Sequence, residues 1–130
     1  MDKKDHIAYW MNTSAKDWEA AEDLYNAKRY VHCLFFLHLA LEKLCKALWI
    51  TNQEENYPPR IHNLVKLLTQ GGVALPDEDM IFLSDMNKFQ LEGRYPDYVS
   101  DIYKIVDKAL ADYYLQKNKI IRQCLIEKLQ

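Results

Sequence analysis

Hydrophobic side chains are densest between Tyr30 and Thr51, where no glycine or proline interrupts the chain. This stretch is too long and too rich in leucine for a β-strand, and its apolar residues would point in almost every direction around a helix. A helix that is apolar on nearly all sides belongs at the centre of a bundle rather than on its rim. The pattern therefore predicts a central helix from Tyr30 to Thr51, with one narrow polar stripe made of His38, Glu42, Lys43 and Lys46.

The other segments also place apolar residues at helical spacing, and none shows the period-two pattern of a β-strand. Glycine and proline are scarce, with 3 and 4 residues, and they mark the boundaries between these segments. We expect an all-α fold, an up-and-down bundle of about five helices, in a single domain over residues 1–130. The helices expected besides the central one cover residues 5–27, 61–70, 77–91 and 99 to near the C-terminus.

The last expected helix, which starts at about Val99, is longer than a compact bundle of this size needs. If it is straight, its final turns project beyond the bundle and expose apolar residues that a partner must cover, which indicates a homodimer. A kink near Asn118 that folds these turns back is an equally good interpretation. The apolar residues concerned are Ile120, Ile121, Cys124 and Leu125.

The composition is that of a folded protein, because 49% of the 130 residues are hydrophobic and 28% are charged. The net charge of -2 argues against broad, non-specific binding to nucleic acid, although it is compatible with a local basic patch. Three cysteines, an odd number without a pairing rhythm, indicate a reducing compartment. Since the charged N-terminus does not resemble a signal peptide and polar residues interrupt the central helix, we expect a cytoplasmic protein that does not cross a membrane.

The polar stripe on the central helix is the first candidate site. His38, Glu42 and Lys46 are four residues apart, so they lie along one side of the helix. One interpretation is an ion pair on the helix surface between Glu42 and Lys46, which contributes about 0.3–0.5 kcal/mol, with His38 hydrogen-bonded nearby. The other is a polar cleft in which Glu42 orients Lys43 or Lys46 towards a phosphate. A buried glutamate–lysine pair is costly to desolvate, and this favours a stripe that opens on a groove.

Arg94 and Tyr95 form the second candidate site, between Gly93 and the start of the last helix. Arg94 either holds helix-end carbonyls or a carboxylate such as Glu42, or it recognises a phosphate near a helix N-terminus. Tyr95 and Tyr98 are interpreted first as packing residues, with stacking on a base as the alternative.

The remaining histidines give weaker signals. We expect His62 to cap or orient the short third helix, and a basic patch shared with Arg60 and Lys66 is the alternative. His6 and His32 have no metal-ligand spacing with a cysteine or an acidic residue. The chain also has no phosphate-cradling glycine loop and no serine–glycine elbow, so we expect neither a metal nor a cofactor.

Four stretches in this order resemble the HEPN domain, a family of small helical bundles. Together they span roughly Trp18 to Ala111, and their order makes the resemblance fairly specific. The stretches are Trp18-x-x-Ala21-x-Asp23-Leu24-x-x-Ala27, the aromatic start Phe35-Phe36 followed by Ala40-x-Glu42-Lys43-x-x-Lys46-Ala47, Ile61-His62-Asn63-Leu64 with Leu67-Leu68, and Arg94-Tyr95-Pro96-Asp97.

The resemblance implies a bundle of four or five helices, often dimeric, with an intracellular role around RNA or nucleotides. Many HEPN domains are paired with a minimal nucleotidyltransferase in toxin–antitoxin systems, and one branch cleaves RNA without a metal. That branch carries an arginine followed about four to six residues later by a histidine. This chain departs from the signature, because residues 98–101 after Arg94 include no histidine and none occurs after His62. Such cleavage needs a base near neutral pH, and histidine is the usual one.

We therefore predict a non-catalytic HEPN-type module that binds a nucleotide or RNA phosphate, forms a homodimer and works with a minimal nucleotidyltransferase. One alternative is a metal-independent ribonuclease toxin in which Arg94 is supported by an atypical base, His38 or His62. A third interpretation is a helical interaction protein whose polar stripe is structural. The candidate ligand-binding residues are His38, Glu42, Lys43, Lys46, Arg94 and Tyr95.

Overall fold

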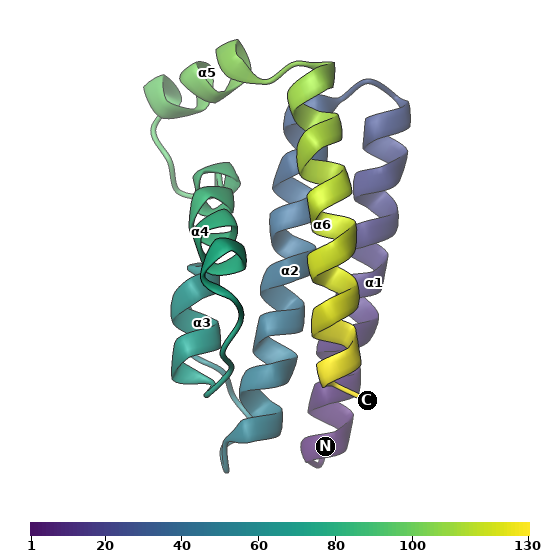
Figure 1. The fold of residues 1–130 in the computed structure, drawn as a ribbon, viewed down its shortest axis with the longest axis vertical. Helices are drawn as coiled ribbons and strands as arrows, with labels where there is room; N and C mark the ends of the chain where they lie inside the picture. Colours follow the sequence, from purple (N-terminus) through teal and green to yellow (C-terminus); the bar gives the residue numbers. More distant parts are fainter.

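The computed structural model describes all 130 residues and contains helices, turns and loops but no strand, which confirms the all-α prediction (Figure 1). It has six α-helices and one turn of 3-10 helix, η1, where about five helices were expected. The elements are α1 (Lys3–Asn26), α2 (Tyr30–Asn52), α3 (Leu64–Gln70), α4 (Asp77–Met86), η1 (Asn87–Phe89), α5 (Pro96–Ile105) and α6 (Lys108–Lys128).

The helix α2 is at the centre of the bundle, as its hydrophobic pattern predicts. In Figure 1 the long helices α1, α2 and α6 lie side by side, and the short helices α3 and α4 cover another side of α2. Most side chains of α2 are buried, including the polar side chains of His38, Glu42 and Lys46. Both termini lie at the end of the bundle opposite the end that α5 crosses (Figure 1).

Local contacts fix α1 and α2 against each other at both ends. The turn between them places Lys28 at a φ of 62°, in the left-handed region that a side chain disfavours. At the other end, the Lys3 ammonium donates to the carbonyl oxygens of Ile50, Gln53 and Glu55 at 3.0, 2.7 and 3.2 Å. These bonds add a donor to carbonyl oxygens at and beyond the end of α2, where the Ile50 oxygen also accepts from the Gln53 backbone N–H at 3.3 Å.

The prediction of one long last helix is wrong, because the chain breaks between α5 and α6. Val106 has an extended backbone, and the Asp107 side chain accepts a hydrogen bond from the Leu110 backbone N–H at 2.8 Å. Asp107 is therefore the N-cap of a new helix. α6 turns back along α1 and α2 instead of continuing in the direction of α5 (Figure 1).

The final turns of α6 consequently do not project. Ile121 and Leu125 are buried in the core, Cys124 is half-buried, and only Ile120 of the four apolar residues is exposed. The helix is unbroken through Asn118, so the kink expected there is also absent. Projecting turns thus give no support to a homodimer, because the chain covers this face itself.

The predicted boundaries of the third and fourth helices also need correction. α3 begins at Leu64 rather than Ile61, because the Asn63 side chain accepts a hydrogen bond from the Lys66 backbone N–H at 3.1 Å and caps the helix there. α4 ends at Met86 and passes directly into η1, short of the expected end at residue 91. As a result, residues 61–63 stay outside the helix, where His62 contacts Glu42 of α2, and η1 packs against α2.

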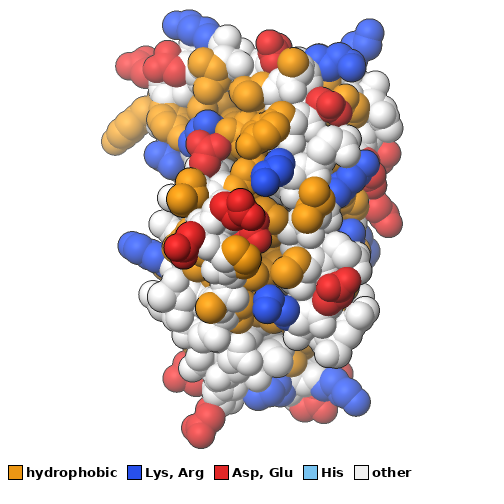
Figure 2. Space-filling view, in the orientation of Figure 1, with side chains coloured by type: hydrophobic (Ala, Val, Ile, Leu, Met, Phe, Trp, Pro, Cys, Tyr) orange, Lys and Arg blue, Asp and Glu red, His pale blue; other side chains and the backbone are white.

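The surface shown in Figure 2 mixes basic and acidic side chains, and its hydrophobic side chains gather mainly towards the end that α5 crosses. No helix of the chain combines the length and apolar character that crossing a lipid bilayer requires. All three cysteines are free thiols, and Cys33 and Cys45 are buried. Burial raises the pKa of the Cys33 thiol to about 12, so this side chain stays protonated and acts as a small apolar residue.

Candidate functional site

The Glu42 carboxylate, at the middle of α2, is the centre of a buried polar network. Its Oε2 accepts a hydrogen bond from Lys46 Nζ at 3.0 Å, and its Oε1 accepts one from His62 Nδ1 at 2.9 Å. Glu42 is 4% exposed and Lys46 8%, so both charges are largely removed from water. A carboxylate in such a place needs these donors, because an unpaired buried charge is strongly destabilising.

His38, one turn before Glu42, is held in a defined tautomer by Asn87. The Leu64 backbone N–H donates to Asn87 Oδ1 at 3.1 Å, so this oxygen is an acceptor. His38 Nε2 lies 3.2 Å from the same oxygen and therefore carries the proton. The other nitrogen, Nδ1, is buried without a hydrogen-bond partner and lies 3.9 Å from Glu42 Oε1.

The pKa of His38 follows from this position. Its side chain is 0% exposed, and burial lowers its pKa below the ordinary value of 6.5, against the opposing effects of Asn87 and Glu42. The neutral form is thus favoured. At neutral pH, His38 is therefore an uncharged member of the network. It does not provide a positive charge for binding an anion.

His62 differs from His38 because its side chain is 48% exposed. An ionised carboxylate can only accept hydrogen bonds, so Nδ1 of His62 carries the proton that binds Glu42. The second nitrogen, Nε2, is then free, and it is either a base or, when protonated, a donor. A carboxylate that holds one imidazole nitrogen in this way fixes the orientation of the ring. The expected capping role belongs instead to Asn63, which accepts from the Lys66 backbone N–H.

Next to this network is a small hollow, which we call the polar hollow. It has a volume of about 140 Å³ and no hydrophobic residue in its lining, which consists of His62, Asn63, Asn87, Gln90 and Arg94. Side chains from the segment before α3, from η1 and from the loop before α5 thus meet at one point. Two of these residues, His62 and Asn87, belong to the network around Glu42, so the network and the hollow are continuous.

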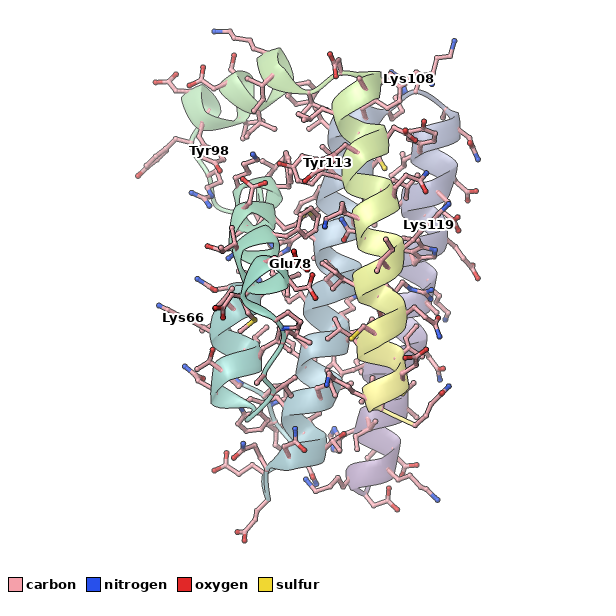
Figure 3. All side chains as sticks on the ribbon, in the orientation of Figure 1. Lys66, Glu78, Tyr98, Lys108, Tyr113 and Lys119 are labelled. Carbon is pink, nitrogen blue, oxygen red and sulfur yellow. The ribbon has the colours of Figure 1, made fainter.

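Arg94 is held at the hollow by contacts on two sides. Its Nε donates to the Gln90 carbonyl oxygen at 3.1 Å, and its guanidinium lies over the Tyr98 ring at 4.3 Å from the centroid. Tyr98 extends from α5 towards α4 (Figure 3), and its hydroxyl donates to the Lys88 carbonyl oxygen at 2.7 Å. The two Nη groups of Arg94 make no hydrogen bond within the chain, so they remain available.

Gln90 contributes a further donor without a partner. Its side chain is 5% exposed, and its Oε1 accepts from the Glu92 backbone N–H at 2.8 Å. Its Nε2 is buried and has no hydrogen-bond partner, which is unusual for a buried polar atom. The hollow is therefore rich in donors, and a small anion with several acceptor oxygens would satisfy them.

The structure brings together only some of the predicted site residues. His38, Glu42 and Lys46 belong to one network, and Arg94 lies at the adjoining hollow. Lys43 is not part of it, because its Nζ pairs with Asp17 of α1 at 2.6 Å. Tyr95 is 84% exposed and is not one of the residues that line the hollow.

Lys46 is also not among the residues that line the polar hollow. Its Nζ lies over the Trp10 ring at 5.1 Å from the centroid and donates to Glu42, so it is enclosed by α1 and α2. The sequence did not indicate Asn87 or Gln90, since their place depends on where α4 ends. It indicated His62 only in alternative interpretations, as part of a basic patch or as an atypical base beside Arg94.

A comparison with the families of known proteins matches residues 7–129, nearly the whole chain, to the HEPN domain. The match includes residues of all six α-helices, and thus both the network around Glu42 and the polar hollow. No curated protein and no solved structure matches the chain.

Proposed function

The chain belongs to the HEPN domain family, and we propose that it is a non-catalytic module that binds a nucleotide or RNA phosphate in the polar hollow. The observation that carries the proposal is the set of unpaired donors there. Arg94 presents two Nη groups without a partner and Gln90 a buried Nε2, and His62 Nε2 becomes a further donor when its ring is protonated. Phosphate oxygens accept such hydrogen bonds, and a charged donor makes them stronger.

The surroundings of the hollow favour an anion further. Arg94 stands two residues before Pro96, the first residue of α5, and the N-terminus of a helix carries partial positive charge. The guanidinium is pre-oriented by Gln90 and Tyr98, so little conformational entropy is lost when it binds a phosphate. Lys46 acts indirectly, by neutralising Glu42 and so limiting the repulsion between this carboxylate and the ligand.

We propose the partners on the basis of the family. The module would work with a minimal nucleotidyltransferase in a system of the toxin–antitoxin or stress-response kind. We also propose a homodimer, which an apolar groove supports rather than the final turns of α6. The groove lies between α2 and α5, has a volume of about 630 Å³ and is lined mainly by apolar residues, among them Phe35, Leu39 and Tyr103. Analytical ultracentrifugation tests the dimer, and co-purification tests the nucleotidyltransferase.

A second function, RNA cleavage without a metal, is favoured by the contact between His62 and Glu42. His62 Nε2 would take the proton of a ribose 2′-hydroxyl while the 2′-oxygen attacks phosphorus. The bond from phosphorus to the 5′-oxygen would then break, and water would supply the proton that this oxygen takes up. Arg94, on the same hollow, would stabilise the charge that develops on the phosphate.

Thermal unfolding tests the binding function. A panel of nucleotides and a short RNA is added to the wild type, to Arg94→Ala and to Lys104→Ala, which removes an exposed cation from α5. A ligand at one hundred times its Kd stabilises the folded protein by about 2.7 kcal/mol. We expect a raised Tm with at least one ligand in the wild type and in Lys104→Ala, and none in Arg94→Ala. No shift with any ligand would refute the proposal.

An RNA-degradation assay separates binding from cleavage. Purified wild type, Arg94→Ala and His62→Ala are incubated with RNA in the absence of metal ions. For a non-catalytic module we expect the same small loss of RNA in all three samples. Cleavage by the wild type that both substitutions abolish would replace the binding function with the ribonuclease function, with His62 as its base.

A further inference from the structure

A second pocket lies between the first half of α1 and the segment before α3, and its walls are mostly aromatic. It has a volume of about 250 Å³, and we call it the aromatic pocket. No group of three or more His, Cys, Asp or Glu side chains in the chain is placed to share a metal ion. The four rings that line the aromatic pocket belong to His6, Tyr9, Trp10 and Tyr57.

These rings are arranged edge to face and leave ring surface open to solvent. His6 and Tyr57 have centroids 5.1 Å apart at 69°, and Tyr9 and Trp10 have centroids 5.4 Å apart at 77°. Tyr57 is 76% exposed and Tyr9 is 53% exposed. Aromatic side chains that pack the core bury their faces, so two exposed tyrosines at one hollow indicate a surface that a flat, apolar ligand covers.

Asn56 adds a polar feature to the same pocket. Its Oδ1 is buried and has no hydrogen-bond partner. A buried carbonyl oxygen without a donor is costly, and a ligand that presents an N–H group would satisfy it. The pocket thus combines stacking surfaces with one acceptor, which suits a nucleobase.

A chain of side-chain contacts links the aromatic pocket to the polar hollow. Lys46 covers the Trp10 ring and donates to Glu42, which in turn holds His62 at the hollow. Glu42 and Lys46 are one helical turn apart, about 6 Å along α2. The segment of residues 57–62 also connects the two pockets, because Tyr57 lines the aromatic pocket and His62 lines the polar hollow.

An unpaired cation lies on this connecting segment. Arg60 is exposed and forms neither a hydrogen bond nor an ion pair, and it stands between the proline pair 58–59 and His62. A phosphate backbone that follows the segment would therefore meet Arg60 between the two pockets. A cationic ligand is disfavoured in the aromatic pocket, because the Lys46 ammonium already covers the Trp10 ring.

We propose that the aromatic pocket is a base-binding site for a single-stranded oligonucleotide whose phosphate occupies the polar hollow. This inference rests on the proposed function and specifies its ligand, which would be an oligonucleotide of two or more units rather than a mononucleotide. Tyr57 and Tyr9 stack on the base, Asn56 accepts from one of its N–H groups, and Arg60 contacts the intervening backbone.

Fluorescence anisotropy with two labelled ligands tests the site. One ligand is a hexamer of riboadenylate, and the other is an abasic ribose-phosphate hexamer of the same length and charge. The proteins are the wild type, Tyr57→Ala, Tyr57→Phe and Arg94→Ala. Tyr113→Ala is the control, because Tyr113 is a tyrosine of α6 with a similar open position, 52% exposed (Figure 3).

We expect Tyr57→Ala to weaken binding of the riboadenylate hexamer roughly ten-fold, as loss of one stacked base does, and to leave the abasic hexamer unaffected. Tyr57→Phe and Tyr113→Ala should bind like the wild type, and Arg94→Ala should weaken both ligands. If Tyr57→Ala binds both ligands like the wild type while Arg94→Ala is impaired, the base site is refuted and the phosphate site stands. If the wild type binds neither ligand, the proposed function itself is refuted, and the base site with it.

Discussion

At the scale of single residues, Glu42 explains why polar side chains occur in an otherwise apolar helix. It is the common acceptor for Lys46 from its own helix and for His62 from the segment before α3. Its function is therefore to pair one buried cation and to orient one exposed imidazole. The spacing of His38, Glu42 and Lys46 was visible in the sequence, whereas the contact with His62 depends on how the chain returns after α2.

Replacing Glu42 by glutamine should reveal the cost of leaving Lys46 without a counter-charge. We expect Glu42→Gln to lower the free energy of unfolding by about 3 kcal/mol, as the breaking of a buried ion pair does. The matched control is Asp101→Asn, which breaks the pair with Lys104, where both side chains are more than 70% exposed (75% and 73%). The control should change stability by less than about 0.5 kcal/mol in the same urea unfolding experiment. Equal effects of the two substitutions would show that Glu42 is not buried as described.

The pH dependence of stability should report on His38. Since burial lowers its pKa in the folded state, the unfolded chain binds a proton at His38 when the folded protein does not. The resulting stability is fully present above the unfolded pKa of 6.5 and is lost as pH falls from there towards the lower folded pKa. Glu42, His62 and Asn87 are the groups that face this ring.

The experiment is urea unfolding of the wild type and of His38→Gln between pH 7.5 and pH 5. In the wild type, His38 should contribute a loss of up to about 1.4 kcal/mol per pH unit within this window. The variant cannot bind this proton, so its stability should fall less steeply. Parallel curves for both proteins would show that His38 is not held neutral.

At the scale of elements, the break between α5 and α6 decides the shape of the molecule. The apolar spacing continues from Val99 to the C-terminus, which is why the sequence pattern predicts one helix. The capping by Asp107 and the extended backbone of Val106 are local features within that continuous pattern. Periodicity identifies which face of a helix is apolar, but it does not show where an aspartate side chain replaces a helical hydrogen bond.

Removal of this cap should weaken the start of α6. We expect Asp107→Ala to lower the free energy of unfolding by about 1 kcal/mol, because the Leu110 N–H loses its acceptor. Lys119→Ala serves as the comparison, since Lys119 is exposed in the middle of the same helix and should change stability little. A stable Asp107→Ala variant with unchanged denaturation would indicate that α5 and α6 can form one continuous helix.

At the scale of the whole molecule, the sequence identified the central helix, the all-α class and the family, because all three depend on patterns within the chain. The polar hollow could be predicted only in part. Arg94 was recognised from its position before a helix, but Asn87 and Gln90 reach the hollow through the packing of η1 on α2. Lys43 was grouped with its neighbours by sequence, yet its direction around the helix takes it to Asp17 of α1.

Binding of a labelled single-stranded RNA to the wild type and to Arg94→Ala is the most direct test of the polar hollow as a phosphate site. Lys104→Ala, which removes an exposed cation of α5, controls for the loss of one positive charge. Loss of hydrogen bonds from a charged donor, at about 1.5–3 kcal/mol, predicts a Kd roughly ten-fold to one-hundred-fold higher for Arg94→Ala and an unchanged Kd for Lys104→Ala. If instead Arg94→Ala binds RNA as tightly as the wild type, the hollow is not the phosphate site.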